Sequence, residues 1–257
     1  MLKARELSVQ FGGLKAVSNV TLDVYEGEIV SLIGPNGAGK TTFFNIVSGF
    51  LKPTSGSVKF MDSDITGFTP HEIAGKGLVR TFQKTNIFAD VSVAESIKIG
   101  FHLHRKAGLC DIMMGGSVSR RENSEVRERS EDILAFMGLA SWKWHLVKNI
   151  PYGKQRMLAI ALALAAEPKL LLLDEPATGM NPVETQELMN IILKIRNEKK
   201  ITIFLIEHNM SLVVSISDQI VVLCYGEKLT EGKPSEVSKD PRVIEAYLGR
   251  GYGHAAS

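Results

Sequence analysis

The alternation of hydrophobic and polar residues along the first part of the chain predicts β-strands. Between residues 2 and 33, short segments rich in Val, Leu and Ile alternate with polar residues, and turns such as the one at Gly12 separate them. The last segment, EIVSLIG at 28–34, is almost entirely apolar, which is typical of a strand buried on both faces. A glycine-rich loop follows it, and then FFNIVSGF at 43–50, an apolar stretch of helical length. The order strand, glycine loop, helix is the first organising signal in the sequence.

Helical and strand patterns alternate again in the second half of the chain. Near-continuous apolar strands separated by helices predict a parallel sheet with helices on both of its faces. The region from about 85 to 167 has helical patterns and no convincing strand. The elements expected after residue 50 are, in chain order, a strand at Ser57–Phe60, a helix from about Pro70, a strand at Leu78–Phe82, a helix at 92–104, a helix at Lys154–Ala166, a strand at Lys169–Leu173, a helix at Val183–Glu198, and strands at Ile201–Ile206 and Ile220–Tyr225.

The expected fold class is therefore α/β: a mostly parallel sheet with helices on both faces, an antiparallel β part at the N-terminus and an inserted helical lobe. We expect residues of about 1–84 and 168–257 to form the core and residues of about 85–167 to form the helical subdomain. A mixed-charge tract, RRENSEVRERSED at 120–132, has nearly cancelling charges at i,i+3 and i,i+4 spacings. Such a tract is typical of a solvated helix face.

Composition and charge narrow the classes of function. The chain has 257 residues, of which 44% are hydrophobic and 23% charged, as in an ordinary globular protein. Lys and Arg number 30 against 28 Asp and Glu, so the net charge of +2 gives no bulk electrostatic reason to bind nucleic acid or anionic lipid, although a local basic patch is still allowed. Cys110 and Cys224 form no disulfide framework, which favours a reduced, intracellular setting.

The N-terminal sequence and the longest apolar run argue against export and against a membrane span. The first residues, MLKARELSVQFGG, carry charges where a signal peptide needs its apolar core. The longest apolar run, Met157–Ala166, is shorter than the roughly 20 residues that a helix needs to cross a bilayer. We therefore expect that the chain does not cross a membrane alone.

A phosphate-binding pattern occupies the glycine-rich loop. Gly34, Gly39, Lys40 and Thr41 satisfy G-x-x-x-x-G-K-[ST]. The glycines allow successive backbone N–H groups to turn toward an anion, and the following helix adds the positive end of its dipole. We expect Lys40 to contact the β- and γ-phosphates and the Thr41 hydroxyl to ligate Mg²⁺, which makes the core that of a P-loop NTPase. The alternative is an ordinary glycine turn beside a surface lysine.

Two carboxylates follow a second buried strand, in LLLLDEP at 170–176. Asp174 is expected at the carboxyl end of this strand, where ligands bind in open α/β sheets, and it can supply the carboxylate that a Mg²⁺–nucleotide site needs. Glu175 has no obvious structural role there and fits a general base that polarises the attacking water. The alternative is that the two acids only cap the strand end.

These motifs resemble those of the nucleotide-binding subunits of ABC transporters. The loop at 34–42, the LLLLDEP strand and YGKQR at 152–156 carry the resemblance, which covers essentially the whole chain. Within the family, the sequence most resembles the ATPases of branched-chain amino acid uptake systems. The segments that carry this closer resemblance are VRTFQ, the long insert after it, NPVETQEL, LIEHNM and VIEAYLG. The resemblance implies ATP and Mg²⁺ as cofactors, and it assigns nucleotide binding to Gly34, Pro35, Asn36, Gly37, Ala38, Gly39, Lys40, Thr41, Thr42 and Asp174.

The resemblance also assigns roles to three residues outside the loop. Phe11 matches an aromatic residue that stacks on adenine, and the alternative is a buried strand phenylalanine. Gln83, which ends VRTFQ, matches the glutamine that reaches Mg²⁺ and the attacking water and reports to the membrane subunit. His208 in LIEHN matches the histidine that contacts the γ-phosphate and orients the water. The implied catalytic residues are therefore Glu175, His208 and Gln83, and the implied Mg²⁺ ligands are Thr41, Gln83 and Asp174.

The segment Pro151–Lys154 occupies the position of the family's signature segment, which is usually Leu-Ser-Gly-Gly-Gln. In the family this segment opens a helix that faces the ATP on the opposite subunit, so that a dimer closes each site. Here Pro151 replaces Ser, Tyr152 replaces the first Gly, and Lys154 replaces Gln, while Gly153 is retained. Lys154 either restores positive charge at this position or is a solvated lysine.

Asn181 in ATGMN takes the place of an Asp that is usual in a family loop crossing the dimer interface. Asn keeps the hydrogen-bonding capacity of Asp but loses its charge. The altered signature stands beside an intact loop, Asp174, Glu175 and His208. We therefore hypothesise that the subunit pairs with a related sister ATPase and that the two sites hydrolyse ATP unequally.

The resemblance implies an ATP-hydrolysing subunit of an importer, bound to integral-membrane permease subunits. It places the subunit peripherally, at the cytoplasmic face of the cell (inner) membrane. A second ATPase subunit would complete a homo- or heterodimer, and a periplasmic or extracellular solute-binding protein would act indirectly; no nucleic acid is expected as a partner. Branched-chain amino acids are the implied solute, while amides, urea or another small polar solute stay open.

Two weaker groups of residues have competing interpretations. His102, His104 and Cys110 are either metal ligands or part of a polar loop, but zinc sites normally need four well-spaced donors. Four apolar residues after Gln83 either pack between the lobes or, by the resemblance, form a groove for a cytoplasmic helix of the membrane subunit. They are Ile87, Phe88, Val91 and Val93.

The sequence leaves three alternative classes of function to compare with a transporter ATPase. A soluble ABC-type ATPase acting on nucleic acid or ribosomes usually has two cassettes or a long coiled-coil insert, whereas this chain has one cassette and no sustained heptads. A non-hydrolysing structural subunit is supported only by the altered signature. A P-loop kinase is disfavoured because it would leave Glu175, Gln83 and His208 unexplained together.

Overall fold

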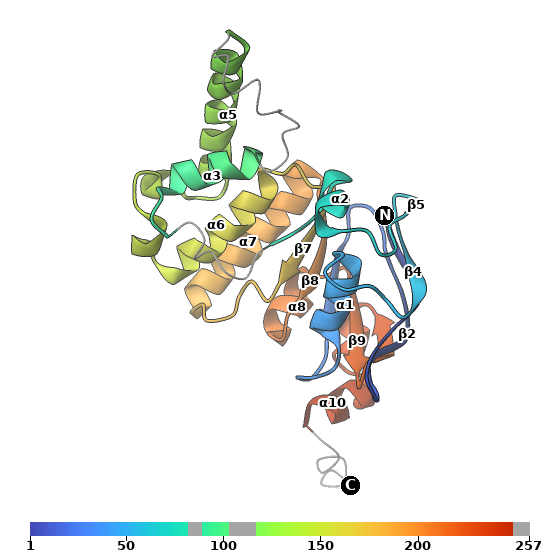
Figure 1. The fold of residues 1–257 in the computed structure, drawn as a ribbon. Helices are drawn as coiled ribbons and strands as arrows, with labels where there is room; N and C mark the ends of the chain where they lie inside the picture. Colours follow the sequence, from blue (N-terminus) through green and yellow to red (C-terminus); the bar gives the residue numbers. More distant parts are fainter. Residues whose placement is uncertain (82–88, 103–116, 249–257) are drawn as a thin grey trace. The chain divides into compact units, whose positions relative to one another are not determined.

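The computed structural model describes residues 1–81, 89–102 and 117–248. The chain divides into two compact units. Unit 1 comprises Met1–Arg80, Lys169–Thr178 and Thr185–Ser257, and unit 2 comprises Thr81–Pro168 and Gly179–Glu184. Figure 1 shows the sheets in unit 1 and the helices of unit 2.

Unit 1 contains a six-stranded sheet in the order β10-β9-β3-β8-β7-β6. Neighbouring strands are parallel except β10, which runs antiparallel to β9 at one edge. The strands are β3 (Ile29–Ile33), β6 (Leu78–Arg80), β7 (Leu170–Asp174), β8 (Thr202–Ile206), β9 (Gln219–Cys224) and β10 (Glu227–Gly232). The five parallel strands confirm the predicted apolar strands; β10 was not predicted because EKLTEG is mostly polar and lies at the edge of the sheet.

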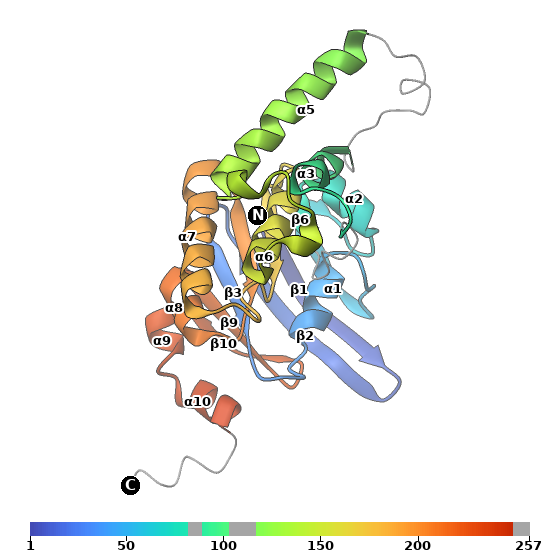
Figure 2. The ribbon, with the colours of Figure 1, turned by 90° about the vertical axis from the view of Figure 1, so that its left-hand side faces the viewer.

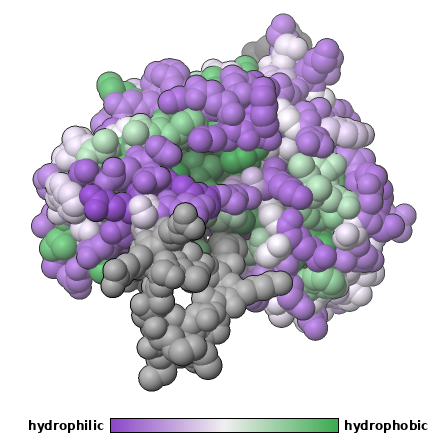
Figure 3. All heavy atoms as spheres, turned by 90° about the horizontal axis from the view of Figure 1, so that it is seen from above, coloured by the Kyte–Doolittle hydropathy of each residue, from purple (hydrophilic) through white to green (hydrophobic). Residues whose placement is uncertain are grey.

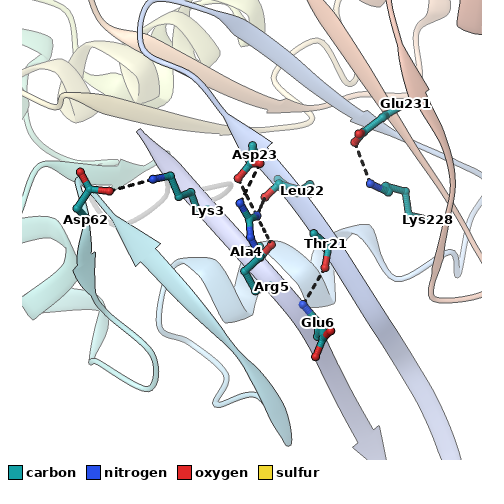
Figure 4. A network of polar contacts seen from close by, with 10 residues as sticks. All are labelled: Lys3, Ala4, Arg5, Glu6, Thr21, Leu22, Asp23, Asp62, Lys228 and Glu231. Atoms are coloured by element: carbon teal, nitrogen blue, oxygen red, sulfur yellow. Dashed lines mark hydrogen bonds and ion pairs between the residues drawn. The ribbon is translucent and has the colours of Figure 1, made fainter.

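A second, four-stranded antiparallel sheet has the order β2-β1-β4-β5 and confirms the antiparallel N-terminal part. Its strands are β1 (Leu2–Phe11), β2 (Leu14–Val24), β4 (Ser55–Phe60) and β5 (Ser63–Asp64). Figure 4 shows the polar contacts of this sheet, in which Lys3 pairs with Asp62 and Arg5 with Asp23. The β1–β2 register shifts near Glu6, whose φ is 50°, and the Glu6 N–H donates to Thr21 Oγ1 over 2.9 Å. The Thr21 hydroxyl thus accepts a hydrogen bond from the Glu6 N–H, which the bulge leaves without a backbone partner in the sheet.

Helices cover both faces of the parallel sheet, as predicted. Along β3, Val30 and Leu32 belong to a core cluster shared with the antiparallel sheet and α1, while Ile33 belongs to a second cluster on the opposite face. β9 follows the same rule, because successive side chains of a strand point to opposite faces. The helices assigned mainly to unit 1 are α1 (Lys40–Val47), α2 (Pro70–Gly75), α7 (Pro182–Lys199), α8 (Met210–Ile216), α9 (Pro234–Val237) and α10 (Pro241–Leu248).

Unit 2 is helical, and within its described residues the β structure is limited to a bridge between Ser92 and Leu146. Its helix α3 packs against α5 and α6, and Figure 2 shows the 20-residue α5 running past α3. Val126, Ser130 and Leu134 are buried at four-residue intervals along α5, while most of the charged residues between them are exposed. The predicted solvated helix face is thus confirmed for the described side chains. The elements are α3 (Val93–His102), α5 (Ser117–Phe136), α6 (Tyr152–Leu164), and the 3₁₀ helices η2 (Ala140–Trp142) and η3 (Val147–Asn149).

Within the described residues, none of the helices has the length and apolar character needed to cross a bilayer. On the face drawn in Figure 3, hydrophilic residues cover most of the surface and hydrophobic residues gather in limited areas between them.

Aromatic packing anchors α1 to the parallel sheet. The ring of Phe204 on β8 lies 4.8 Å from that of Phe44 and 6.3 Å from that of Phe43, both on α1. All three side chains are fully buried. Because α1 begins directly after the glycine loop, this cluster also fixes where the loop lies.

We predict that Phe204→Ala lowers the free energy of unfolding by about 3–5 kcal/mol, because it removes a buried ring and leaves a cavity under α1. Chemical denaturation measures the loss. Val183→Ala is the matched control, because Val183 is exposed and its truncation should change stability by less than about 0.5 kcal/mol. A loss of under about 1 kcal/mol in Phe204→Ala would show that the cluster does not anchor the helix.

Candidate nucleotide-binding site

The glycine loop connects the buried strand β3 to α1 and requires glycine at two positions. Gly34 and Gly39 have φ values of 146° and 96°, in the range that favours glycine. A Cβ at Gly34 would lie 2.1 Å from the Leu223 carbonyl oxygen, and a Cβ at Gly39 would lie 2.4 Å from that of Ala16. The loop is therefore pressed against the β9 and β2 backbones, where side chains do not fit.

The N-terminus of α1 presents backbone N–H groups without a side-chain cap. Gly39 is the N-cap and contributes no side-chain hydrogen bond, and the first turn contains no acidic residue. By helix geometry the N–H groups of Lys40, Thr41 and Thr42 have no partner within the helix. Together with the positive end of the helix dipole, they form a binding site for an anion such as a phosphate.

Lys40 lies folded over the loop. Its Nζ donates to the carbonyl oxygens of Gly34 over 2.7 Å and of Pro35 over 3.0 Å. The residue is only 6% exposed. Burial lowers the pKa of the Lys40 ammonium, and the carboxylates of Glu175 and Asp174 oppose that shift. The charge is thus held between the loop and two acids, as a phosphate-binding lysine requires.

A cavity of about 500 Å³ lies at this loop, a size suited to a small ligand such as a nucleotide. The lining residues belong to unit 1 and are Phe11, Leu14, Lys15, Ala16, Asn36, Gly37, Ala38, Gly39, Lys40, Thr41, Thr42, Glu175, Tyr225 and Gly226. Phe11 is 52% exposed, so the alternative of a buried strand phenylalanine is wrong. The cavity therefore brings together an aromatic residue, the glycine loop and one carboxylate.

Asp174 ends β7 and is 3% exposed. Its Oδ2 accepts a hydrogen bond of 2.6 Å from Arg80 Nη2, while Oδ1 is buried and has no hydrogen-bond partner among the described residues. Arg80 on β6 donates to Asn45 Oδ1 of α1 over 2.8 Å and to Oγ of Ser48, the C-cap of α1, over 3.1 Å. An unpartnered buried carboxylate oxygen is costly unless a donor or cation completes it. Asp174 thus fits a site for a divalent cation beside the loop.

Glu175 has a strained backbone. Its φ is 46°, which is uncommon for a residue other than glycine, and its N–H donates to the Ile206 carbonyl of β8 over 2.9 Å. Thr178 Oγ1 donates to Glu175 Oε2 at a long 3.5 Å. The side chain lines the cavity. Strain of this kind is typical of functional positions, where surrounding contacts hold an unfavourable conformation.

Glu207 is a buried carboxylate that organises the ends of two strands. Its Oε1 accepts the Ala177 N–H over 2.8 Å, and its Oε2 accepts the His208 N–H over 3.1 Å. The loop after β7 is thereby tied to the residue that follows β8. The side chain of His208 is 56% exposed and is not among those that line the cavity.

The signature residues lie at the start of α6, in unit 2. Pro151 is the N-cap and gives no side-chain hydrogen bond, and Tyr152 begins the helix. A Cβ at Gly153 would lie 2.5 Å from Glu184 Oε1, so a larger residue here would require the Glu184 side chain to move. The Arg156 guanidinium lies 5.0 Å from the centre of the Tyr152 ring, an arrangement typical of a cation–π contact.

Asn181 caps the N-terminus of α7. Its Oδ1 accepts the Glu184 N–H, and Glu184 Oε2 accepts the Asn181 N–H, both over 3.0 Å. This reciprocal pair is a capping box built on Asn. The residue thus has a structural role that accounts for a polar side chain at this position.

Three residues of the site were not predicted from the sequence. Arg80 and Glu207 lie within the quoted segments VRTFQ and LIEHNM, and the signal available was a charged residue at or directly after the end of an apolar strand. Tyr247 on α10 accepts the Gly34 N–H at its hydroxyl oxygen over 2.8 Å. Burial raises the pKa of its phenol, an effect that the Gly34 N–H opposes. No local pattern predicts this contact, because 213 positions separate the two residues.

Several predicted residues fall outside the described part of the chain. Gln83, Ile87, Phe88, His104 and Cys110 are among them, as is the side chain of His102. Val93 is fully buried in unit 2, and the Val91 carbonyl accepts the Val147 N–H over 3.0 Å. The described residues contain no group of three or more His, Cys, Asp or Glu side chains that could hold a metal. Cys224 is a free thiol.

We predict that Arg80→Met lowers the free energy of unfolding by about 3 kcal/mol or more, because it leaves the buried Asp174 carboxylate without its partner. Urea denaturation at neutral pH measures this loss. The double variant Arg80→Met/Asp174→Asn should recover much of it, because the uncompensated charge is gone. Equal stability of Arg80→Met and the unaltered protein would contradict the inference that this ion pair compensates Asp174.

Comparison with known proteins identifies relatives over nearly the whole chain. The family model described as ABC transporter matches residues 17–178, and that described as branched-chain amino acid ATP-binding cassette transporter matches residues 227–253. The high-affinity branched-chain amino acid transport ATP-binding protein LivG of Escherichia coli is 44% identical over 249 residues, which cover 97% of this chain and 98% of LivG. The corresponding protein BraF of Pseudomonas aeruginosa is 41% identical over 249 residues, with the same 97% and 98% coverage.

A solved structure agrees with these sequence relatives. It is the ADP conformation of an ATP-binding cassette of an ABC transporter, with a TM-score of 0.84 and 31% identity over 97% of this chain and 98% of that chain. The matches confirm the predicted fold class, the predicted resemblance and the predicted ATPase activity. The chain is therefore an ATP-binding cassette and belongs to the ABC transporter family.

Proposed function

We propose that this chain is the ATP-hydrolysing subunit of an importer for branched-chain amino acids or a related small polar solute. The observation that carries the ATPase part is the cavity, in which an uncapped helix N-terminus, a buried lysine and Glu175 meet. The names of LivG and BraF and the match at residues 227–253 support the solute class.

The nucleotide is held by the loop and by Phe11. The loop residues Gly34–Thr42 surround the phosphates, and the amides at the start of α1 and Lys40 Nζ compensate their charge. Phe11 ends β1 and lines the cavity, and its exposed ring stacks on adenine. Stacking gives affinity with little selectivity between bases, because every base has a π-face.

Thr41, Asp174 and Gln83 would hold Mg²⁺. The unpartnered Oδ1 of Asp174 and the oxygen donors of this set suit a hard cation that prefers oxygen ligands. When bound, the ion neutralises charge on the phosphates. In its absence Arg80 pairs with Asp174, so the arginine compensates the carboxylate charge and holds the side chain in place.

Glu175 acts as the general base. Its carboxylate accepts a proton from the attacking water, while the Ile206 carbonyl and Thr178 keep the residue in its strained conformation. His208 orients the water and contacts the γ-phosphate. Glu207 acts through its neighbours, because it fixes both the His208 backbone and the loop that follows Glu175.

A second ATPase subunit completes the site. The residues that line the cavity belong to unit 1, and the signature residues Pro151–Lys154 belong to unit 2. In a dimer, the signature of each subunit would face the phosphates held by the other. The partner is either a second copy or a related sister ATPase, and Lys154 supplies positive charge to that contact.

The hydrolytic cycle would be coupled to transport through permease subunits. We place the chain peripherally at the cytoplasmic face of the cell membrane, with residues of about 85–167 as the helical subdomain that contacts the permease. Gln83 and the apolar residues after it would report nucleotide state to that contact. A solute-binding protein outside the membrane would act through the permease, and nucleic acid has no role.

We predict that Glu175→Gln binds Mg-ATP but loses hydrolysis by about 10²–10⁴-fold, because the amide cannot accept the proton of the attacking water. Equilibrium ATP binding and steady-state phosphate release by the assembled complex separate the two effects. Lys40→Ala is the control for the binding step and should lose both binding and hydrolysis. Near-normal phosphate release by Glu175→Gln would remove Glu175 as the base.

If the partner is a sister ATPase, we predict unequal sites, because this chain's signature has Pro151 where a Ser is usual. Glu175→Gln and the equivalent change in the sister should then lower phosphate release by different factors when each is assembled with the other, unaltered subunit. The same loss from both changes would contradict the hypothesis of unequal hydrolysis.

A further inference from the structure

The cavity has a second aromatic residue, and it stands in an unfavourable turn. Tyr225 and Gly226 connect β9 to β10 as a two-residue hairpin in which Cys224 pairs with Glu227. Their φ values are 50° and 81°, so both residues are left-handed, as in a type I′ turn. Asn, Asp and Gly are the residues favoured at the first position, whereas a bulky aromatic residue is disfavoured. Turn chemistry therefore gives no reason for tyrosine at 225.

Packing gives no reason for tyrosine either. Tyr225 is 89% exposed, so its ring contributes little burial to the folded state. Tyr225 lines the cavity together with residues of the glycine loop. A large, exposed residue that lines a ligand cavity and has a strained backbone is better explained by the ligand than by the fold.

The turn is fastened to the phosphate-binding loop. The Gly226 N–H donates to the Ala38 carbonyl over 3.1 Å, and the Ser18 N–H donates to the Gly226 carbonyl over 2.8 Å. A Cβ at Gly39 would lie 3.4 Å from the Gly226 Cα, which shows how closely the turn and the loop approach. These contacts hold Tyr225 at a fixed place beside the cavity.

Two hairpins thus present aromatic side chains to one cavity. Phe11 lies at the β1–β2 hairpin and Tyr225 at the β9–β10 hairpin, while the phosphate-binding amides lie at the start of α1. When the phosphates occupy the loop, the nucleoside extends into the part of the cavity lined by these hairpins. We propose that Tyr225 is a second nucleoside-contacting residue, which packs its ring against the ribose and adenine of bound ATP. This inference rests on the proposed nucleotide site.

The test compares two ligands on the full-length protein. Mg-ATP contains the nucleoside, whereas inorganic tripolyphosphate with Mg²⁺ offers the phosphates alone. Tyr225→Asn removes the ring but suits the left-handed turn, so thermal unfolding should show no loss of stability. We expect its Kd for Mg-ATP to rise about tenfold, as the loss of one aromatic contact to a nucleoside implies, with the tripolyphosphate Kd unchanged. Tyr225→Phe should keep most of the ATP affinity.

Tyr25→Asn is the matched control, because Tyr25 is also an exposed tyrosine but does not line the cavity. It should bind Mg-ATP like the unaltered protein. An unchanged Mg-ATP Kd in Tyr225→Asn would overturn the inference, and so would a parallel loss of both ligands, which would mean that the turn only positions the loop. Failure of the unaltered protein to bind Mg-ATP would instead overturn the proposed function, and the inference with it.

Discussion

The structure depends on the backbone amides at the start of α1, which are left without partners and directed at one place. Helix geometry removes their intrahelical acceptors, and the N-cap is a glycine that has no side chain to replace them. The packing of Phe43 and Phe44 against Phe204 fixes the helix on the sheet, and Tyr247 holds the backbone where β3 enters the loop. The anion site is thus built into the main chain before any ligand is bound.

The parallel sheet places acidic residues and a histidine at the edge where this anion site lies. Because β3, β7 and β8 are parallel neighbours, their carboxyl ends lie at the same edge, and the residues that follow them meet there. Asp174 and Glu175 follow β7, and Glu207 and His208 follow β8. Arg80 and Glu207 do not contact substrate in this account. Arg80 compensates Asp174, and Glu207 positions the backbone of His208, a residue proposed to act on the substrate.

Much of the core and of the phosphate loop could be predicted from the sequence. The buried strands are continuous apolar runs, and the loop obeys a spacing that few other structures need. β10 and the contact of Tyr247 with Gly34 could not be predicted, for different physical reasons. β10 is a polar edge strand whose pairing depends on β9, and the Tyr247 contact joins residues that are distant in sequence. The strain at Glu175 and Tyr225 is likewise set by tertiary contacts and leaves no pattern in the sequence.

A crystal structure of the protein with Mg-ATP tests the central claim most directly. We expect the β- and γ-phosphates at the amides of the loop and of the first turn of α1, within hydrogen-bonding distance of Lys40 Nζ, with Glu175 facing the γ-phosphate. A triphosphate bound elsewhere, with Lys40 still folded onto the Gly34 and Pro35 carbonyls, would contradict it.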